Sequence, residues 1–376
     1  KIEQKKFQQA NTELNKMNLF VNRLMMLLDP IMTLVMNFSS VAIVWFGAHL
    51  ISSGNLQIGN MMAFLEYAMQ VIISFLLLSM VFIMVPRAAV SVKRVGEVLD
   101  TLPSIVDPQS PQQLPHDATG KIEFKDVTFS YPDADLPVLS SINFTAEPGQ
   151  TTAFIGSTGS GKSTLINLIP RFYDVSAGQI LLDGVDIRQL KLEDLYDQIG
   201  YVPQKGVLFS GTIASNIKYG NAKASQKLVE KSAKIAQATE FISELKNGYK
   251  NDIAQGGSNV SGGQRQRLSI ARAIAVEPNV YIFDDSFSAL DFKTDAKLRL
   301  ALAKETKHKT VLIVGQRINT IMNADKIIVL DEGKIVGQGT HQELMKNCEV
   351  YQEIAASQLS EDDLQKMSAT TAKGAA

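Results

Sequence analysis

Gly156-Ser157-Thr158-Gly159-Ser160-Gly161-Lys162-Ser163 is the stretch that decides the fold of this chain. It matches the phosphate-binding pattern G-x-x-x-x-G-K-[ST], with an apolar run at residues 152–155 before it and helical spacing after it. In a strand–loop–helix unit of this kind, backbone N–H groups surround phosphate oxygens and the helix dipole favours the negative charge. We expect Lys162 to reach the β- and γ-phosphates of a nucleotide and Ser163 to ligate Mg²⁺. The alternative is a Gly/Ser-rich surface turn.

Composition is uneven along the 376 residues, which are enough for two or three folding units. The formal net charge of −1 gives no reason to expect nucleic-acid binding or a strongly acidic partner. The windows 30–65 and 67–86 contain no Asp, Glu, Lys or Arg, which is rare in a soluble domain. The one cysteine, Cys348, excludes an internal disulfide and a cysteine-based metal cluster, so the polar part suits a reducing compartment. Because the sequence starts at Lys1 rather than Met, we expect a segment of a longer protein.

Two apolar segments, residues 31–51 and 61–85, are each close to the ~20 residues that span ~30 Å of hydrocarbon. The turn at 52–55 contains no basic residue. The outer ends of the pair are flanked by basic residues: Lys16, Arg23, Arg87, Lys93 and Arg94. The positive-inside rule therefore predicts a membrane hairpin with both ends in the cytoplasm, preceded by a polar helix within residues 1–23. The alternative is a buried helical hairpin of a large soluble protein.

Two ionisable residues lie in this apolar region. An ionised Glu66 would face a helix-bundle interior or a wet cavity, where it could contact substrate or a coupling ion. It could equally lie near the outer membrane interface, a dozen residues from Gly54. His49 has the same two interpretations.

Four prolines within residues 103–120 indicate a linker. Beyond it, short β-like runs alternate with helical stretches, which predicts an α/β domain with a largely parallel sheet. Asp183-Gly184 and Glu332-Gly333 are typical of hairpin turns. The small, polar tail at residues 357–376 predicts disorder. Strands are expected at residues 122–129, 142–144, 152–155, 180–182, 199–202, 280–283, 311–314, 327–330 and 334–336.

The second half of a nucleotide site lies further along the chain. Asp284 follows an apolar run at residues 280–283, and at the end of a strand it would hold the hydration shell of Mg²⁺ opposite Ser163. Upstream, Ser261-Gly262-Gly263-Gln264 leads into a helical run. Ser261 can cap that helix, and the glycines expose N–H groups at its positive end, which suits a phosphate. Alone, these two signals also fit an ordinary strand end and a capped helix.

Together, the three motifs resemble those of ABC transporters. Residues 120–355 are similar to the family's nucleotide-binding domain, and residues 1–99 are similar to the last two helices of an exporter-type transmembrane domain. The resemblance implies an α/β P-loop ATPase domain at residues 121–356, with an all-α transmembrane hairpin at residues 1–102 before it. It also implies a cell-membrane location with the ATPase domain in the cytoplasm, and ATP and Mg²⁺ as cofactors. The implied partners are a second exporter subunit, the lipid bilayer and a transported substrate. Drugs, lipids and peptides remain open as that substrate, and the resemblance alone favours hydrophobic drugs.

The resemblance assigns roles by position. Tyr131 matches the aromatic residue that stacks on adenine, a contact worth about 1–3 kcal/mol by analogy with base stacking. Gln204 matches the glutamine that contacts Mg²⁺ and the attacking water, and Ser261 to Gln264 match the signature sequence, which closes over the γ-phosphate held by the opposite subunit. Residues 288–291 match the loop that crosses the dimer interface, and residues 14–23 match a short coupling helix.

The expected site thus has three sets of residues. The expected ATP contacts are Tyr131, Gly156, Ser157, Thr158, Gly159, Ser160, Gly161, Lys162, Ser163, Thr164, Ser261, Gly262, Gly263 and Gln264. The expected Mg²⁺ contacts are Ser163, Gln204 and Asp284, and the catalytic positions are Asp285, Gln316 and Gln204.

Two of the catalytic positions depart from the family pattern. Asp285 stands where the family has a glutamate as catalytic base, and its carboxylate is one methylene shorter. It would lie roughly 1.5 Å back from the attacking water, and such misplacement costs on the order of 10²-fold in rate. Gln316 stands where the family has a histidine that contacts the γ-phosphate, and an amide carries no positive charge and cannot shuttle a proton. Both changes favour a site that binds ATP and hydrolyses it slowly.

This combination resembles one subunit of a heterodimeric bacterial exporter that has one weak and one competent composite site. The present chain would give its phosphate loop to the weak site and its signature to the competent one. Two other interpretations remain open. One is a homodimeric exporter that still turns over ATP, and the other is a soluble ABC-type ATPase that acts as an ATP-dependent clamp.

Overall fold

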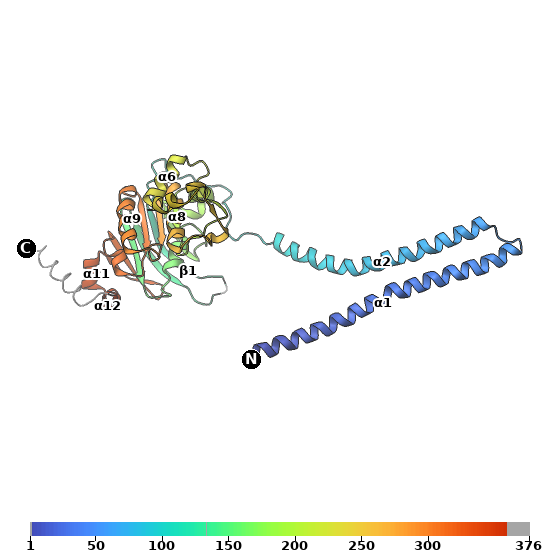
Figure 1. Ribbon diagram of the computed structural model, residues 1–376. Helices are drawn as coiled ribbons and strands as arrows, with labels where there is room; N and C mark the ends of the chain where they lie inside the picture. The colour runs from blue at the N-terminus through green and yellow to red at the C-terminus, as the bar shows by residue number, and fades with distance from the viewer. Residues whose placement is uncertain (1, 133, 359–376) are drawn as a thin grey trace, which may run out of the picture. The chain divides into compact units, whose positions relative to one another are not determined.

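The computed structural model describes residues 2–132 and 134–358 (Figure 1). The chain divides into two units, and the boundary in the sequence falls between Leu102 and Pro103. The first unit is a pair of long helices, α1 (Ile2–Ser52) and α2 (Ile58–Leu99). By length and composition both helices can cross a membrane.

The two helices of the hairpin pack closely beside their turn. Gly47 on α1 is buried, and a Cβ at this position would lie 2.7 Å from Met61 Sδ on α2. Small residues allow this close approach between membrane helices. Most other large apolar side chains of the hairpin are exposed, among them Trp45 and Phe82. Such a surface needs lipid or further helices to cover it.

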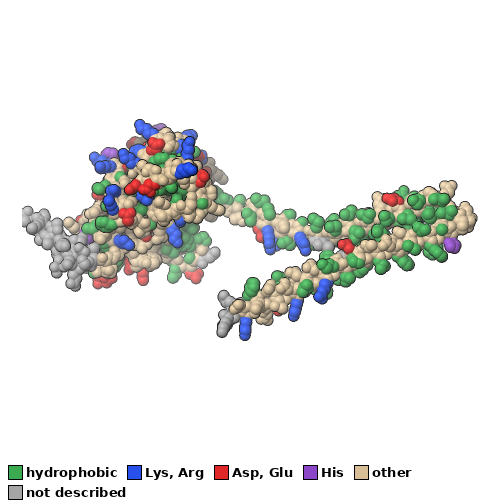
Figure 2. Space-filling view, viewed as in Figure 1, with side chains coloured by type: hydrophobic (Ala, Val, Ile, Leu, Met, Phe, Trp, Pro, Cys, Tyr) green, Lys and Arg blue, Asp and Glu red, His purple; other side chains and the backbone are tan. Residues whose placement is uncertain are grey.

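The basic side chains of the hairpin lie away from its turn. Figure 2 shows the Lys and Arg side chains toward the ends of the two helices opposite the turn, with hydrophobic side chains along their remaining length. This is the distribution that the positive-inside rule associates with a cytoplasmic side. Glu66 and His49 are both exposed in the hairpin, and His49 Nδ1 lies 3.2 Å from Trp45 O on the preceding turn.

The expected short coupling helix at residues 14–23 is wrong as a separate element. These residues lie inside α1, which runs without interruption from Ile2 to Ser52 and includes Pro30. No glycine or proline precedes Pro30, so no residue ends the helix there. Proline inside a membrane helix is tolerated when neighbouring groups satisfy the freed carbonyl. The polar first part and the apolar second part therefore belong to one helix.

The second unit contains two main sheets. The larger has the strand order β12-β11-β3-β10-β9-β6 and is parallel except for the β11–β12 pair. Its strands are β3 (Thr151–Gly156), β6 (Ile199–Val202), β9 (Val280–Asp284), β10 (Thr310–Val314), β11 (Lys326–Asp331) and β12 (Lys334–Gly339). This sheet confirms the expected largely parallel α/β core.

The smaller main sheet is antiparallel, with the order β2-β1-β4-β5, and the expectation of a single sheet missed it. Its strands are β1 (Ile122–Phe129), β2 (Leu139–Ala146), β4 (Ala177–Leu182) and β5 (Val185–Asp186). Apolar runs locate strands but do not give their direction or their sheet, so this division could not be read from the pattern. A further two-stranded pair joins β7 (Gly211–Thr212) and β8 (Asp252–Ile253).

Both predicted hairpin turns are present. Asp183 and Gly184 join β4 to β5 with φ of 48° and 83°, and Glu332 and Gly333 join β11 to β12 with φ of 43° and 75°. Two successive positive φ values are the mark of the turns that match strand twist. At Gly333 a Cβ would lie 2.2 Å from Val138 O, so glycine is also required by close packing.

Helices cover the sheets and contribute to three apolar clusters. One cluster lies between the two main sheets and α3, a second surrounds α8, and the third joins β3 and β11 to α10, α11 and α12. The helices are α3 (Lys162–Leu168), α4 (Leu192–Asp197), α5 (Ile213–Ile217), α6 (Gln226–Ile235), α7 (Thr239–Glu244), α8 (Gly262–Ala275), α9 (Phe292–Glu305), α10 (Ile318–Ile321), α11 (His341–Asn347) and α12 (Glu349–Gln358).

The predicted disordered tail begins too early. Ser357 and Gln358 form the end of α12, because Tyr351 and Ala355 on the same helix are buried in the third cluster. The rest of that prediction falls on residues 359–376, outside the described residues.

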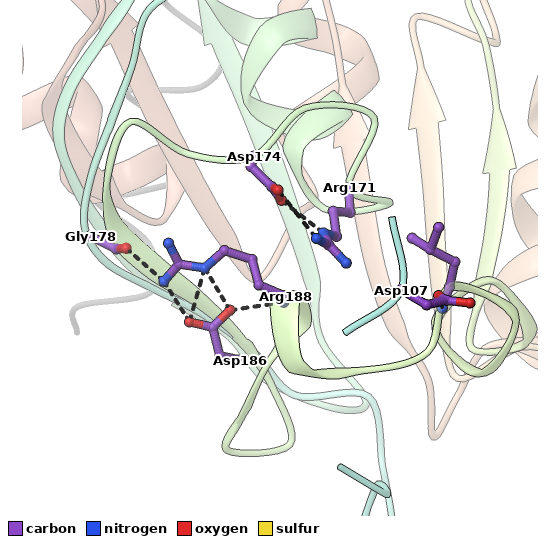
Figure 3. Close-up of polar contacts among 7 residues, drawn as sticks. Asp107, Arg171, Asp174, Gly178, Asp186 and Arg188 are labelled. Carbon is purple, nitrogen blue, oxygen red and sulfur yellow. Dashed lines mark hydrogen bonds and ion pairs between the residues drawn. The ribbon is translucent and has the colours of Figure 1, made fainter. Parts of the chain in front are cut away.

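The proline-rich segment 103–120 begins the second unit and is hydrogen-bonded to the rest of it at several points. Asp107 Oδ1 accepts a hydrogen bond from Leu192 N at the start of α4 (Figure 3). Figure 3 also shows two ion pairs of this unit, in which Arg171 Nε lies 2.7 Å from Asp174 Oδ1 and Arg188 Nη2 lies 2.7 Å from Asp186 Oδ2. At the end of the segment, the Asp183 carboxylate accepts hydrogen bonds from the backbone N–H groups of Thr119, Gly120 and Lys121 and from the Thr119 hydroxyl.

Asp183→Ala is expected to lower the stability of this unit by about 2–3 kcal/mol, because it removes a charged acceptor shared by several donors. In a domain of this size that corresponds to a fall in Tm of several degrees, measurable by thermal unfolding. Asp252→Ala removes an exposed carboxylate and is the control. Equal melting temperatures for the two variants would contradict this account of the carboxylate.

Candidate nucleotide-binding site

Four candidate loops meet at one edge of the parallel sheet. Neighbouring strands β3, β10, β9 and β6 run in the same direction, so their carboxyl ends lie side by side. The phosphate loop follows β3, Gln316 follows β10, Asp284 ends β9 and Gln204 follows β6. This edge is where open α/β sheets bind ligands.

The phosphate loop is curled around its own lysine. Lys162 Nζ donates to Gly156 O at 2.9 Å and to Ser157 O at 2.7 Å, and it lies 3.3 Å from Ser160 Oγ. Gly156 is required here, since a Cβ would lie 2.0 Å from Leu330 O. Burial lowers the pKa of Lys162, and the carboxylates of Asp284 and Asp285 oppose this shift. The ammonium group therefore lies between two carbonyls and a hydroxyl of its own loop.

Two oxygen ligands for a hard cation lie together beside the loop. Ser163 Oγ donates to Asp284 Oδ1 at 3.3 Å, and Asp284 is only 6% exposed. Burial raises the pKa of Asp284, while the hydrogen bond from Ser163 lowers it. The described residues contain no group of three or more His, Cys, Asp or Glu side chains placed to hold a metal. A pair of oxygens without further protein ligands suits Mg²⁺, which keeps several waters and takes the rest of its ligands from phosphates.

Asp285 and Gln204 are brought together. Gln204 Nε2 donates to Asp285 Oδ2 at 3.3 Å, and Asp285 adopts a left-handed backbone with φ of 44°. Burial raises the pKa of Asp285, and hydrogen bonds from Gln204 and Ser288 lower it. The structure thus joins two of the three predicted catalytic positions. Within the described residues Gln204 makes no hydrogen bond to Ser163 or Asp284, so its predicted Mg²⁺ contact stays a prediction.

Gln316 lies in the short loop after β10 and is exposed. The next residue, Arg317, is also exposed, and its charge lowers the pKa of Asp285. Arg317 was not among the predicted site residues. Its position directly after Gln316 was the available signal, because Gln316 was predicted to contact the γ-phosphate and arginine is a natural partner for negative charge.

Tyr131 is tied to the helix that follows the phosphate loop. Its hydroxyl lies 3.0 Å from Thr164 Oγ1, and its ring meets Phe129 and Tyr173 edge to face at centroid distances of 4.9 and 5.2 Å. Thr164 is buried, and its predicted contact with ATP stays a prediction. Tyr173 extends the aromatic surface, and no sequence motif marked it.

Three of the predicted ATP contacts in the phosphate loop are exposed: Ser157, Thr158 and Gly159.

The signature segment forms a capped helix start. Ser261 Oγ accepts from Gln264 N at 3.2 Å, and Gln264 Oε1 accepts from Ser261 N at 3.0 Å, which confirms the predicted cap. A Cβ at Gly263 would lie 3.3 Å from Ala289 O, whereas a Cβ at Gly262 would meet nothing within 4 Å. In the described chain no hydrogen bond joins this segment to the phosphate loop. A single chain therefore does not bring the two halves of the predicted ATP site together.

Gln266 links the signature helix to the loop of Gln204. Its Nε2 donates to Pro203 O at 3.2 Å and its Oε1 accepts from Gly206 N at 3.1 Å, while its side chain is 2% exposed. The amide thus fixes the backbone on both sides of Gln204. A second glutamine in a polar helix start gives no pattern by which this role could be predicted.

Comparison with known proteins covers both units. Residues 139–288 match the family model for ABC transporters, and residues 1–92 match the model for the ABC transporter transmembrane region. The membrane-region match and the two long apolar helices contradict the alternative of a soluble ATPase clamp.

Individual relatives agree with the family models. An uncharacterized ABC transporter ATP-binding protein of Mycobacterium tuberculosis is 46% identical over 359 residues, which are 95% of this chain and 61% of that protein. An ATP-dependent lipid A-core flippase of Syntrophus aciditrophicus is 37% identical over 360 residues, 96% of this chain and 59% of that protein. The structure of a bacterial Atm1-family ABC exporter with ATP bound is similar with a TM-score of 0.76 and 32% identity, covering 88% of this chain and 57% of that one. The chain spans about three fifths of the length of these curated relatives.

Proposed function

The chain belongs to the ABC transporter family, as a membrane protein with a cytoplasmic ATPase domain, and we propose that it is the weak-site subunit of a heterodimeric exporter. In this proposal, ATP binding closes two ATPase domains on each other. The site built on this chain's phosphate loop retains ATP, and its signature segment completes the competent site on the partner subunit.

The observation that carries the proposal is the arrangement around Asp285. Its carboxylate is joined to Gln204 at the carboxyl edge of the sheet, where the family's longer glutamate would act, and the loop beside it presents Gln316 instead of histidine. The phosphate loop, the Ser163–Asp284 pair and the Ser261 cap are all formed. Binding groups are thus complete, while both groups that would handle the proton of the attacking water are altered.

The residues suit Mg-ATP. Lys162 and the loop N–H groups would bind the phosphates, Ser163 and Asp284 would hold Mg²⁺, and the Tyr131–Tyr173 aromatic surface would receive the adenine. The bound cation supplies neutralisation of the negative charge on the β- and γ-phosphate oxygens. Gln204 and Asp285 would orient a water molecule next to the γ-phosphate without giving it a well-placed base.

Asp285→Asn is expected to change the ATPase rate of the assembled heterodimer by less than about threefold, because this site contributes little of the turnover. The measurement is steady-state phosphate release by the purified exporter. Asp285→Glu together with Gln316→His is expected to restore only part of a competent site, since glutamate tolerates the left-handed backbone at this position less well than aspartate. A fall on the order of 10²-fold in the Asp285→Asn exporter would refute the weak-site assignment.

A homodimeric exporter is the second candidate, favoured by the complete set of binding groups in this one chain. Purification of the chain with and without a co-expressed second subunit separates the two. Strong ATPase activity from this subunit alone would establish the homodimer and overturn the heterodimer proposal.

The proposed cargo is an amphipathic molecule with a large apolar part. The name of the Syntrophus relative specifies a lipid, and the exposed apolar surfaces of α1 and α2 suit contact with lipid tails or hydrophobic drugs. Stimulation of ATPase activity by a panel of lipids and drugs, in vesicles of defined composition, distinguishes these classes.

A further inference from the structure

One side chain holds the peptide groups on both sides of Arg317. Gln358, the last residue of α12, donates from Nε2 to Gln316 O at 2.8 Å and accepts at Oε1 from Ile318 N at 2.9 Å. A glutamine amide has donors on one side and an acceptor on the other, so it can satisfy both peptide groups at once. The loop after β10 is therefore clamped by a residue 42 positions from Gln316 in the sequence.

These two hydrogen bonds of Gln358, here called the Gln358 clamp, replace a missing helix cap. Arg317 occupies the N-cap position of α10 and makes no side-chain capping bond, so the first N–H of α10 needs a partner from elsewhere. Gln358 provides it. At the other end of the loop, Gly315 N donates to Phe154 O on β3 at 3.1 Å. The backbone is thus fixed before and after Gln316 and Arg317, whose side chains remain exposed.

The packing of α12 gives the clamp a firm base. Tyr351 and Ala355 of α12 are fully buried in the same apolar cluster as Ile318 and Ile321 of α10. Ala355 lies three residues before Gln358, so the buried face of α12 leads directly to the clamp. The Tyr351 hydroxyl also lies 2.7 Å from His341 Nδ1 on α11.

We propose that Gln358 is a positioning residue for Gln316 and Arg317, and that α12 thereby sets how long this chain retains ATP. The inference rests on the proposed function, in which Gln316 faces the γ-phosphate. A loop held at both ends keeps its amide and guanidinium groups at the phosphate, so it loses little conformational entropy when ATP binds. A loop released at one end loses that preorganisation, and bound ATP then leaves sooner.

The test uses the whole exporter and two measurements on Gln358→Ala. Release of radiolabelled ATP from this chain's site, in Mg²⁺ and at a temperature without turnover, is expected to be on the order of fivefold faster, as for loss of one net hydrogen bond. Amide hydrogen exchange at Ile318 is expected to be faster because this N–H loses its acceptor. Exchange that accelerates with unchanged ATP release would overturn the proposal.

Gln352→Ala is the matched control. Gln352 lies on the same helix, and its Nε2 donates to the backbone carbonyl of Met345 at 2.9 Å, away from the loop. Neither ATP release nor exchange at Ile318 is expected to change. Equal acceleration in the control would assign the effect to general loosening of the C-terminal helices and contradict the proposal.

Gln358→Glu separates the two bonds of the clamp. A carboxylate still accepts from Ile318 N but cannot donate to the Gln316 carbonyl, which it repels. Exchange at Ile318 should stay slow while ATP release becomes as fast as in Gln358→Ala. Wild-type release from this variant would show that the bond to Gln316 does not position the loop. The same experiment measures ATP release from the unmodified exporter. Rapid release there would contradict the proposed function itself, and this result is distinct from failure of the role of Gln358.

Discussion

Gly262→Asp is expected to lower the ATPase rate of the assembled exporter on the order of 10²-fold, the loss typical of removing one preorganised electrostatic contact to a reacting phosphate. In the proposed dimer, this first residue of α8 meets the γ-phosphate bound to the partner subunit. A carboxylate there repels the phosphate and occupies the N–H groups that would bind it. Steady-state phosphate release by the purified heterodimer measures the effect.

The fold of this chain should be unaffected by the same substitution. A Cβ at Gly262 meets nothing within 4 Å, and an acidic residue in the first turn of a helix is favourable. Gln226→Asp is the matched control, because Gln226 is likewise the first residue of a helix capped by a serine, Ser225. We expect the two variants to have similar melting temperatures, but only Gly262→Asp to lose ATPase activity. That result would show that the loss comes from the partner's site and not from misfolding of this chain. Full activity in Gly262→Asp would contradict the trans role of the signature segment.

Lys162→Ala is expected to weaken binding of Mg-ATP to this chain on the order of 10²-fold. The ammonium group lies within the phosphate loop, beside the carbonyls of Gly156 and Ser157. In the proposal it would give the phosphates charge-assisted hydrogen bonds worth about 1.5–3 kcal/mol each. Its removal also takes away a cation that lowers the pKa of Asp284 and of Asp285, although Arg317 still lowers the pKa of Asp285. Crosslinking of a photoreactive ATP analogue to this chain, as a function of concentration, measures the affinity.

Lys227→Ala removes an exposed lysine of α6 and should leave the affinity unchanged. Crosslinking to the partner subunit should also remain in the Lys162→Ala exporter, because that site has its own phosphate loop. Unchanged labelling of this chain in Lys162→Ala would show that the loop is not its ATP site.

The sequence predicted those parts of the site that depend on local backbone chemistry. A glycine-rich loop between a strand and a helix has few conformations that satisfy its N–H groups, so Gly156 to Ser163 fixed both the loop and the place of Lys162. The Ser261 cap was predictable for the same reason, since a serine three residues before a glutamine has a defined partner. The turns at Asp183-Gly184 and Glu332-Gly333 follow mainly from their glycines, which adopt positive φ without steric cost.

Contacts between distant segments could not be predicted in this way. Gln266 and Gln358 have no local pattern, and each acts on a loop that is distant from it in the sequence. Strand direction was equally hidden, which is why the antiparallel sheet was missed. The coupling helix at residues 14–23 was wrong because a family position was transferred to a stretch that has no helix-ending residue.

The weak-site assignment is the central claim, and it predicts which nucleotide this chain holds during turnover. The direct measurement is to crosslink a photoreactive, α-phosphate-labelled ATP to the working heterodimer with Mg²⁺, separate the two subunits, and identify the nucleotide on each. The account predicts mainly ATP on this chain, beside Asp285 and Gln316, and mainly ADP on the partner. Mainly ADP on this chain would contradict it.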